Sequence, residues 1–239
     1  MSDYDIFAKF YDSVMGDRTA EALHIEKLIK QYNPATKKIL ELGCGTGTFL
    51  KYFSDRDYDV AGIDLSEEIL AIARRKLPCA DLSHQNMATF SLSEKHDAIL
   101  CLFDSINHLL DYKDWEKTFS RVSLHLNQNG IFIFDINMKK KLEHLARSKA
   151  IITESDMGKM IMKITSQDGA YNYNVKIIEK QNNGSEIIHE ENIKEQSFPI
   201  KKIEKSLKKI FNQIVLFDQG GGQASEDSRR VYFICLNKF

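Results

Sequence analysis

The chain has 239 residues, of which 43% are hydrophobic and 28% charged, and its formal net charge is −1. This length suits one α/β domain with an insertion or a small second lobe. A charge so close to zero argues against a partner held by the whole surface, such as duplex nucleic acid, and leaves a local basic patch open. No apolar run is long enough for a membrane span and the first residues lack a signal-peptide pattern, so we expect a cytoplasmic protein with no membrane partner.

Helices and strands alternate through the first half of the chain. Two helices are expected at residues 4–14 and 19–31, followed by a break at Asn33-Pro34. Apolar runs then predict strands at residues 38–42, 60–64, 80–84, 97–103 and 131–136. Helices are expected between them at residues 48–53, 67–77 and 112–126. This alternation predicts an α/β fold with a doubly wound parallel sheet, whose ligands bind at the carboxyl ends of the strands.

The pattern changes after Asn137. A basic helix at residues 138–149 precedes alternating segments typical of antiparallel strands, at residues 151–156, 160–166, 170–181 and 187–197. A helix at residues 199–210 and strands at 211–217 and 230–237 follow. We therefore divide the chain into a ligand-binding α/β core (1–137), an inserted helix and antiparallel sheet (138–198), and a final helix and two strands that complete the core (199–239).

A glycine-rich turn follows the first strand. Residues 41–47 read Glu-Leu-Gly-Cys-Gly-Thr-Gly, with glycines at alternate positions. Glycine accepts positive φ and lets a ligand approach the backbone closely. The dinucleotide fingerprint is G-x-G-x-x-G, whereas this turn has G-x-G-x-G preceded by Glu41. A carboxylate at that position suits a ligand that carries an ammonium group better than one that carries phosphates.

A second acid ends the next strand. Asp64 lies about 20 residues beyond Gly43, the separation expected for a side chain that binds ribose hydroxyls. Ser66 is expected to cap the following helix, with Glu67 and Glu68 in its first turn, where the helix dipole favours negative charge. The two segments together indicate a βαβ unit built around a nucleotide-like ligand.

The turn at residues 41–47 resembles motif I of the class I S-adenosylmethionine-dependent methyltransferases. Residues 7–15, 103–109 and 134–137 are similar to a subgroup that includes the bacterial YqeM-like proteins and the aminosugar N,N-dimethyltransferases. The resemblance implies a Rossmann-like sheet of seven mostly parallel strands that ends in an antiparallel hairpin. It also implies that the inserted antiparallel β lobe forms part of the acceptor pocket, as a lid.

The resemblance further implies that the protein binds S-adenosyl-L-methionine and releases S-adenosyl-L-homocysteine. Tyr11 is expected to close over the donor near its sulfonium, and Met87 to pack against the adenine. Where the family usually has an aspartate that reads the adenine amino group, this chain has Asn86, which still offers an amide oxygen. The full set of expected donor-binding residues is Tyr11, Arg18, Glu41, Gly43, Cys44, Gly45, Asp64, Leu65, Asn86, Met87 and Phe103.

Three residues are candidates for a catalytic role beside the donor: Tyr11, Asp104 and His108. A general base is needed only where the acceptor must lose a proton. His108 could serve as that base or could cap a helix, and Asp104 could anchor a cationic or hydroxylated acceptor. The four cysteines, at positions 44, 79, 101 and 235, have no metal-ligand spacing, so we expect reduced thiols and no metal.

We expect methyl transfer to nitrogen or oxygen of a small molecule, with the acceptor itself left open. An RNA or protein acceptor is the alternative, because lysines cluster at residues 139–149 and 201–209, although solvated helix faces explain such clusters as well. A non-catalytic protein that binds S-adenosylmethionine is a third interpretation, and a dinucleotide-dependent oxidoreductase a distant fourth. Oligomeric state, including a homodimer through the inserted sheet, stays open.

Overall fold

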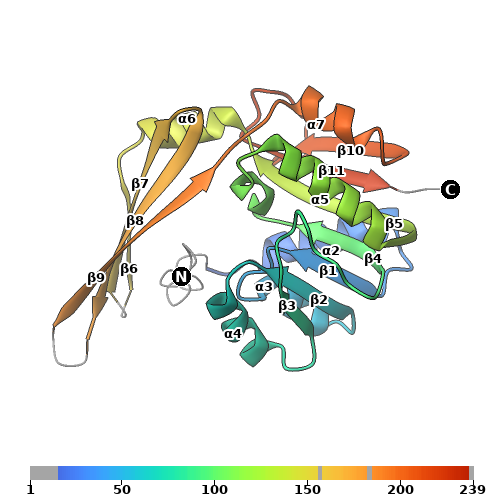
Figure 1. Cartoon of the computed structure of the whole chain (residues 1–239), viewed down its shortest axis with the longest axis horizontal. Coiled ribbons are helices and arrows are strands. Elements are labelled where there is room, and N and C mark those ends of the chain that lie inside the picture. Colours follow the sequence, from blue (N-terminus) through green and yellow to red (C-terminus); the bar gives the residue numbers. More distant parts are fainter. Residues whose placement is uncertain (1–15, 156–157, 182–184, 237–239) are drawn as a thin grey trace.

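Two β-sheets lie side by side in the computed structural model, which describes residues 16–155, 158–181 and 185–236. The larger sheet carries helices on both faces, and the smaller one projects beside it, at the left of the view (Figure 1). The helix expected at residues 4–14, and with it Tyr11, lies outside the described residues.

The larger sheet has seven strands in the order β10-β11-β5-β4-β1-β2-β3. Its neighbours from β5 to β3 pair in parallel, whereas β11 pairs antiparallel with β5 and β10 antiparallel with β11. The predicted fold class is therefore confirmed, including the antiparallel hairpin at its edge. The strands are β1 (Lys38–Leu42), β2 (Asp59–Asp64), β3 (Asp81–His84), β4 (His96–Cys101), β5 (Leu126–Asn137), β10 (Gln213–Asp218) and β11 (Arg230–Leu236).

Side chains on the two faces of this sheet form two separate hydrophobic clusters. Successive side chains of a strand point to opposite faces, so Phe132 and Phe134 join one cluster while Ile131 and Ile133 join the other. Helices α5 (Tyr112–His125) and α7 (Ile200–Leu207) pack on the first face. The second face is covered by α2 (Thr19–Tyr32), α3 (Thr48–Ser54) and α4 (Glu67–Lys76). Burial on both faces explains the long apolar runs in the sequence.

The predicted cap of α4 is confirmed. The Ser66 hydroxyl accepts a hydrogen bond from the Ile69 backbone N–H at 3.2 Å, and Glu67 and Glu68 occupy the first turn. A capping serine satisfies one of the N–H groups that a helix start leaves without a partner. This cap fixes where the chain turns away from the end of β2.

The inserted segment forms a second, antiparallel sheet in the order β6-β7-β8-β9. It is preceded by α6 (Lys139–Arg147) and consists of β6 (Ile151–Ser155), β7 (Gly158–Gln167), β8 (Ala170–Lys180) and β9 (Glu186–Glu195). The predicted turn at Asp168-Gly169 has φ of 51° and 81° at its two residues, the signature of a type I′ hairpin turn. The inserted antiparallel sheet is thus confirmed.

Some boundaries differ from the prediction. The helix α5 ends at His125, and β5 begins at once with Leu126 rather than at Ile131. Leu126 pairs with His96 and Ile131 with Ala98, and the register shifts between these two pairs, so residues 127–130 form an irregular stretch with no paired residue in β4. Strand β10 begins at Gln213 instead of 211, because Phe211 closes the turn after α7 with a hydrogen bond to the Leu207 carbonyl.

Candidate functional site

The glycine turn between β1 and α3 has the conformation that its sequence requires. Gly43, Gly45 and Gly47 have φ of 66°, 55° and 77°, in the left-handed region that other residues avoid. A Cβ at Gly43 would lie 3.0 Å from the Ser105 Cβ, so the turn and the loop after β4 are in close contact. The three glycines form a tight turn at the carboxyl end of β1.

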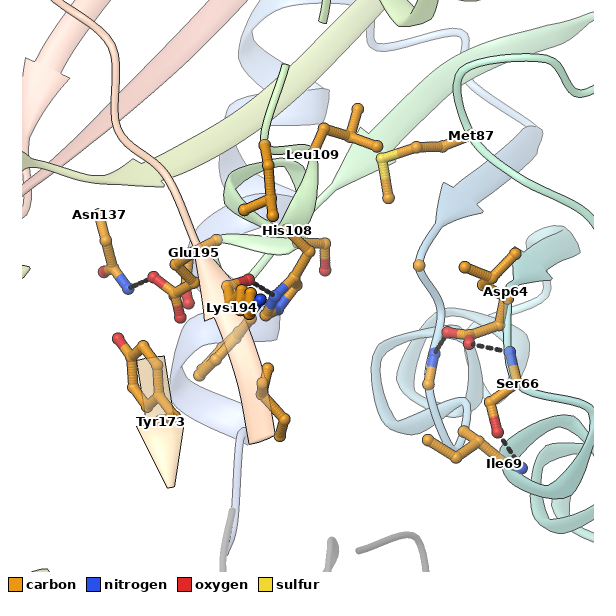
Figure 2. A pocket seen from close by; sticks show the side chains of 18 of the residues that line it. Asp64, Ser66, Ile69, Met87, His108, Leu109, Asn137, Tyr173, Lys194 and Glu195 are labelled. Carbon is orange, nitrogen blue, oxygen red and sulfur yellow. Dashed lines mark hydrogen bonds between the residues drawn. The ribbon is translucent and has the colours of Figure 1, made fainter. Parts of the chain in front are cut away.

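Asp64 joins this turn to the end of β2. One carboxylate oxygen accepts a hydrogen bond from the Gly45 N–H at 2.8 Å, and the other accepts from the Ser66 N–H at 2.9 Å (Figure 2). Burial raises the pKa of Asp64 above its ordinary value, against the effect of these backbone donors. The carboxylate keeps further lone pairs that can accept hydroxyl groups of a ligand.

A cavity of about 550 Å³ opens at the carboxyl ends of the parallel strands. Its volume lies within the range of roughly 300–1,000 Å³ typical of small-ligand sites. Figure 2 shows its two sides, with Asp64, Ser66 and Met87 on one and Glu195, Tyr173 and Asn137 on the other. Seven of the expected donor-binding residues line it, namely Gly43, Gly45, Asp64, Leu65, Asn86, Met87 and Phe103.

The other described members of that set lie around a smaller cavity of about 30 Å³ that adjoins Gly43 and Phe103. Glu41 is 3% exposed, and its Oε2 atom has no hydrogen-bond partner among the described residues. Burial, with a smaller contribution from Asp64, raises the pKa of Glu41 well above its ordinary value. The Arg18 guanidinium lies 4.3 Å from the centre of the Phe103 ring. A buried carboxylate atom without a partner is costly unless a ligand satisfies it.

Cys44 and Asn86 have roles in holding the backbone. The Cys44 side chain is buried, with its Sγ 3.8 Å from the Gly45 carbonyl, and burial raises the pKa of its thiol well above the ordinary value, so the thiol stays protonated. The Asn86 amide oxygen, which we expected to face the adenine, accepts a hydrogen bond from the Ala88 N–H at 2.8 Å. That oxygen therefore also orders the turn after β3.

The loop after β4 is held by a buried carboxylate that the sequence did not indicate. Phe103 and Asp104 both have positive φ, 56° and 54°. The Asp135 carboxylate, 1% exposed, accepts both of their backbone N–H groups, at 2.7 Å and 3.1 Å. The Arg230 guanidinium donates hydrogen bonds to the carboxylates of Asp135 and Asp104 together. Asp104 thus lines the cavity as expected, but already paired with a cation.

His108 lies at the end of the short helix η1 (Ser105–His108), on the cavity wall. Its Nδ1 atom lies 3.0 Å from the Lys194 carbonyl oxygen, which connects η1 to the inserted sheet. Its neighbour Asn107 is fully buried, and its amide nitrogen donates to the carbonyls of Asn137 and Gln196. These contacts place His108 where the two sheets meet.

The far end of the cavity contains a polar cluster around Glu195, which ends β9. Asn137 donates its amide nitrogen to Glu195 Oε2 at 3.1 Å and accepts Lys141 Nζ on its amide oxygen at 2.6 Å. Burial and the negative charge of Asp104 raise the pKa of Glu195 to about 8, and burial lowers the pKa of Lys141. Burial also raises the pKa of Tyr173, whose hydroxyl bonds to Glu195.

Sequence reasoning missed most of this cluster. Asn137 stood out as the end of a strand, but nothing in the pattern around Lys141, Tyr173, Glu195 or Arg230 distinguished them from surface residues. The available signal was topological: β11 begins with Arg230 opposite Asn137 at the end of β5, and β9 ends with Glu195, which contacts the same Asn137.

Comparisons with known proteins agree with this geometry. A family model described as a methyltransferase domain matches residues 39–130. A Geobacillus sp. (strain WCH70) protein, provisionally named a methyltransferase, is 33% identical over 160 residues, 64% of each chain. The dTDP-3-amino-3,4,6-trideoxy-alpha-D-glucopyranose N,N-dimethyltransferase of Streptomyces venezuelae is 32% identical over 55% of each chain. The Bacillus subtilis protein YqeM is 27% identical over 96% of this chain and 95% of its own. The matches to the first three curated relatives span 64%, 52% and 55% of those proteins' own lengths.

Solved structures share the whole architecture. A S-adenosylmethionine-dependent methyltransferase from Clostridium acetobutylicum ATCC 824 superimposes with a TM-score of 0.86 over 99% of both chains, at 24% identity. This likeness concerns the fold, which combines the seven-stranded sheet with an inserted antiparallel one. Residues 39–130 therefore contain a methyltransferase domain, and the chain as a whole is similar to proteins named as methyltransferases, with the same fold as a solved S-adenosylmethionine-dependent methyltransferase.

Proposed function

We propose that the protein transfers a methyl group from S-adenosyl-L-methionine to a nitrogen or oxygen atom of a small molecule, by in-line displacement. The observation that carries this proposal is that one cavity extends from the glycine turn and Asp64 to the polar cluster of the inserted sheet. A donor site and an acceptor site that share one cavity can bring two reactants together, which is the main contribution that positioning makes to catalysis.

The donor end fits S-adenosylmethionine. Asp64 can accept the ribose hydroxyls, and Met87 and Leu65 offer apolar contacts to the adenine. The partnerless Glu41 oxygen and the Arg18 guanidinium lie around the adjoining cavity, where they suit the ammonium and carboxylate groups of the amino-acid part. Bound there, the donor supplies a methyl group already activated on a sulfonium, so the chain itself must position the acceptor and exclude water.

The acceptor end supports a small molecule. Its walls combine apolar side chains, Leu109, Leu145, Met162 and Ile193, with the polar cluster around Glu195. Several relatives are named as enzymes that methylate amines: aminosugar N,N-dimethyltransferases and a glycine/sarcosine N-methyltransferase. Those names favour nitrogen over oxygen as the accepting atom here.

An RNA or protein acceptor has less support. To bind RNA, the lysines in and directly after α6 and α7 would have to contact phosphates, yet Lys140 pairs with Asp227 at 3.1 Å and Lys208 with Glu204 at 3.2 Å. The side chain of Lys202 lies over the Tyr112 ring, 4.0 Å from its centre. These lysines are exposed members of ion pairs and ring contacts, as solvated helix faces are.

Among the catalytic candidates, we propose that His108 and Asp104 act on the acceptor side, since both line the cavity. Asp104 is the weaker candidate for a base, because its carboxylate already forms an ion pair with Arg230. Tyr11 remains a proposed donor contact from the sequence resemblance alone.

Calorimetric titration with S-adenosylmethionine tests the donor assignment, and incubation with donor labelled in the methyl group, together with fractionated metabolites or RNA, tests the acceptor class. We expect donor binding and transfer of label to a metabolite fraction. Binding of NAD without binding of S-adenosylmethionine would overturn the proposal, and label found in RNA alone would favour the alternative.

A further inference from the structure

We propose that Glu195 recognises the amino group of a cationic amine acceptor and shares one proton with it in the complex. This inference rests on the proposed function, of which it specifies the acceptor side. It makes Glu195 a specificity-determining residue supplied by the inserted sheet, in addition to His108 and Asp104 of the core.

Glu195 lies on the cavity wall but is almost inaccessible to water. Its side chain is 3% exposed and belongs to the residues that line the cavity. Asn137 donates to one carboxyl oxygen, and the Tyr173 hydroxyl contacts the group from β8 (Figure 2). Both of these hydrogen-bond partners are neutral, and the Lys141 cation lowers the pKa of the carboxyl group by less than burial and the Asp104 carboxylate raise it.

Among the charged groups around Glu195, the carboxyl groups outnumber the cations by one when Glu195 is ionised. Arg230 from β11 pairs with both Asp104 and Asp135. Lys141 from α6 donates to Asn137 and forms no ion pair within the part of the chain that the structure describes. His108 from η1 contacts the Lys194 carbonyl. The two bases, Arg230 and Lys141, offset Asp104 and Asp135, so ionisation of Glu195 leaves one net negative charge at this end of the cavity.

This distribution of charge determines whether Glu195 is protonated before and after an amine binds. Burial and the facing Asp104 carboxylate raise the pKa of Glu195 to about 8, so the carboxyl group holds a proton at pH 7 when no acceptor is bound. An ammonium group in contact with Glu195 supplies the missing positive charge and favours the carboxylate. Binding should therefore expel the Glu195 proton to solvent.

The remaining proton can lie on either partner. With the proton on nitrogen, the pair is an ammonium carboxylate; with the proton on Glu195, it is a neutral amine beside a carboxylic acid. Only the second arrangement leaves the nitrogen lone pair free to form a bond to carbon. A carboxyl group whose pKa is raised toward neutrality is suited to hold that proton, since general bases work best when their pKa lies near the operating pH.

Two small probe molecules of similar shape test whether Glu195 recognises an amine and loses its proton, without knowledge of the natural acceptor. Cyclohexylamine and cyclohexanol have the same ring and differ in carrying an ammonium or a hydroxyl group. Each is titrated by calorimetry into the protein saturated with S-adenosylhomocysteine, in buffers of different ionisation enthalpy, so that protons released on binding are counted. At pH 7 we expect the amine to release most of one proton, because a group of pKa about 8 is mainly protonated there. Release should fall toward zero near pH 9.5, and the alcohol should release none.

The variant Glu195→Gln keeps the shape of the side chain and removes its ionisation. We expect it to lower the preference for the amine over the alcohol by about ten- to a hundredfold, as loss of a charge-assisted hydrogen bond does, and to abolish proton release. The control Glu190→Gln removes an exposed carboxylate of the same strand, paired with Lys176 on the surface, and should change neither quantity.

The outcomes separate this inference from the proposed function. If S-adenosylhomocysteine binds but the wild-type protein releases no proton with the amine, or Glu195→Gln retains the preference, the role of Glu195 is wrong and the donor assignment stands. If S-adenosylhomocysteine does not bind at all, the proposed function itself fails. The pH dependence in the wild-type protein tests the inference even where the variant does not fold.

Discussion

The Asp64 carboxylate accepts the backbone N–H of Gly45 at 2.8 Å, which fixes the end of β2 against the glycine turn that follows β1. The same side chain lines the cavity on the side of the expected donor. A single carboxylate therefore orders the turn and presents acceptor atoms to a ligand. We therefore expect the conformation of the turn to be coupled to donor binding.

Asp64→Asn should weaken donor binding by about ten- to a hundredfold, because an amide is a poorer acceptor for hydroxyl and N–H groups than a carboxylate is. Calorimetry with S-adenosylmethionine measures the change. Asp81→Asn, an exposed change at the start of β3, is the control and should bind the donor as the wild-type protein does. Equal donor affinity in Asp64→Asn and wild type would contradict a contact with the ribose.

Gly43→Ala tests the close contact between the turn and the loop after β4. Alanine at φ 66° is strained by about 1–2 kcal/mol, and its Cβ would lie 3.0 Å from Ser105 Cβ. Gly221→Ala introduces alanine at φ 80° with no atom within 4 Å, so it isolates the backbone strain. We expect Gly43→Ala to lower the free energy of unfolding more than Gly221→Ala in urea titrations, and to be the variant that reduces donor binding. Similar losses in both variants would mean that the contact with Ser105 is unimportant.

Much of the fold follows from local signals in the sequence. The buried strands β1, β2 and β4 are apolar runs because both faces of the sheet are covered, and the Ser66 cap and the Asp168-Gly169 turn depend on a few adjacent residues. The start of β5 was wrong because residues 127–130 are polar and look like a turn. They fall within β5 because Leu126, on their N-terminal side, pairs with His96 of β4, and pairing between distant segments is invisible in a local pattern.

The candidate site likewise has one part that local sequence signals predict and another part that they do not. The donor end is built from two adjacent βα turns, so Gly43, Gly45 and Asp64 could be predicted from spacing. The acceptor end joins Asp104, Arg230 and Glu195, which lie on three separate segments of the chain. Which carboxylate receives the arginine is decided by the register of β11 against β5, and the sequence carries no local mark of that register.

Asp135→Asn should be strongly destabilising. The Asp135 carboxylate accepts the backbone N–H groups of Phe103 and Asp104, two residues with positive φ, and it forms an ion pair with the buried Arg230. Removal of one partner of a buried ion pair costs about 3–5 kcal/mol. The control Asp55→Asn breaks an exposed pair with Lys51 and should cost less than about 1 kcal/mol. Urea-induced unfolding compares the two variants. A loss for Asp135→Asn as small as that for Asp55→Asn would show that the loop holds its conformation without this carboxylate.

Glu41→Gln should stabilise the ligand-free protein at neutral pH while weakening donor binding. Glu41 is buried and its pKa is raised well above the ordinary value, so at neutral pH the folded protein pays a free-energy cost, relative to the unfolded chain, for keeping this acid out of water. Glutamine fills the same space without an ionisable group. If Glu41 meets the donor's ammonium, its replacement removes a charge-assisted contact, so stability and affinity should change in opposite directions, as they often do at functional sites.

The pH dependence identifies the cause of that stabilisation. The pKa of Glu41 is raised well above 4.5 in the folded protein, so the folded state keeps a proton that the unfolded state loses. The contribution of Glu41 is therefore most favourable below pH 4.5 and declines as the pH rises from there toward the raised pKa. The gain in free energy of unfolding from Glu41→Gln should accordingly be larger at pH 8 than at pH 5, measured by urea titration at both. A gain that is the same at both pH values would mean that Glu41 is ionised in the folded protein over this whole range. The negative charge of Glu41 would then exist before the donor binds.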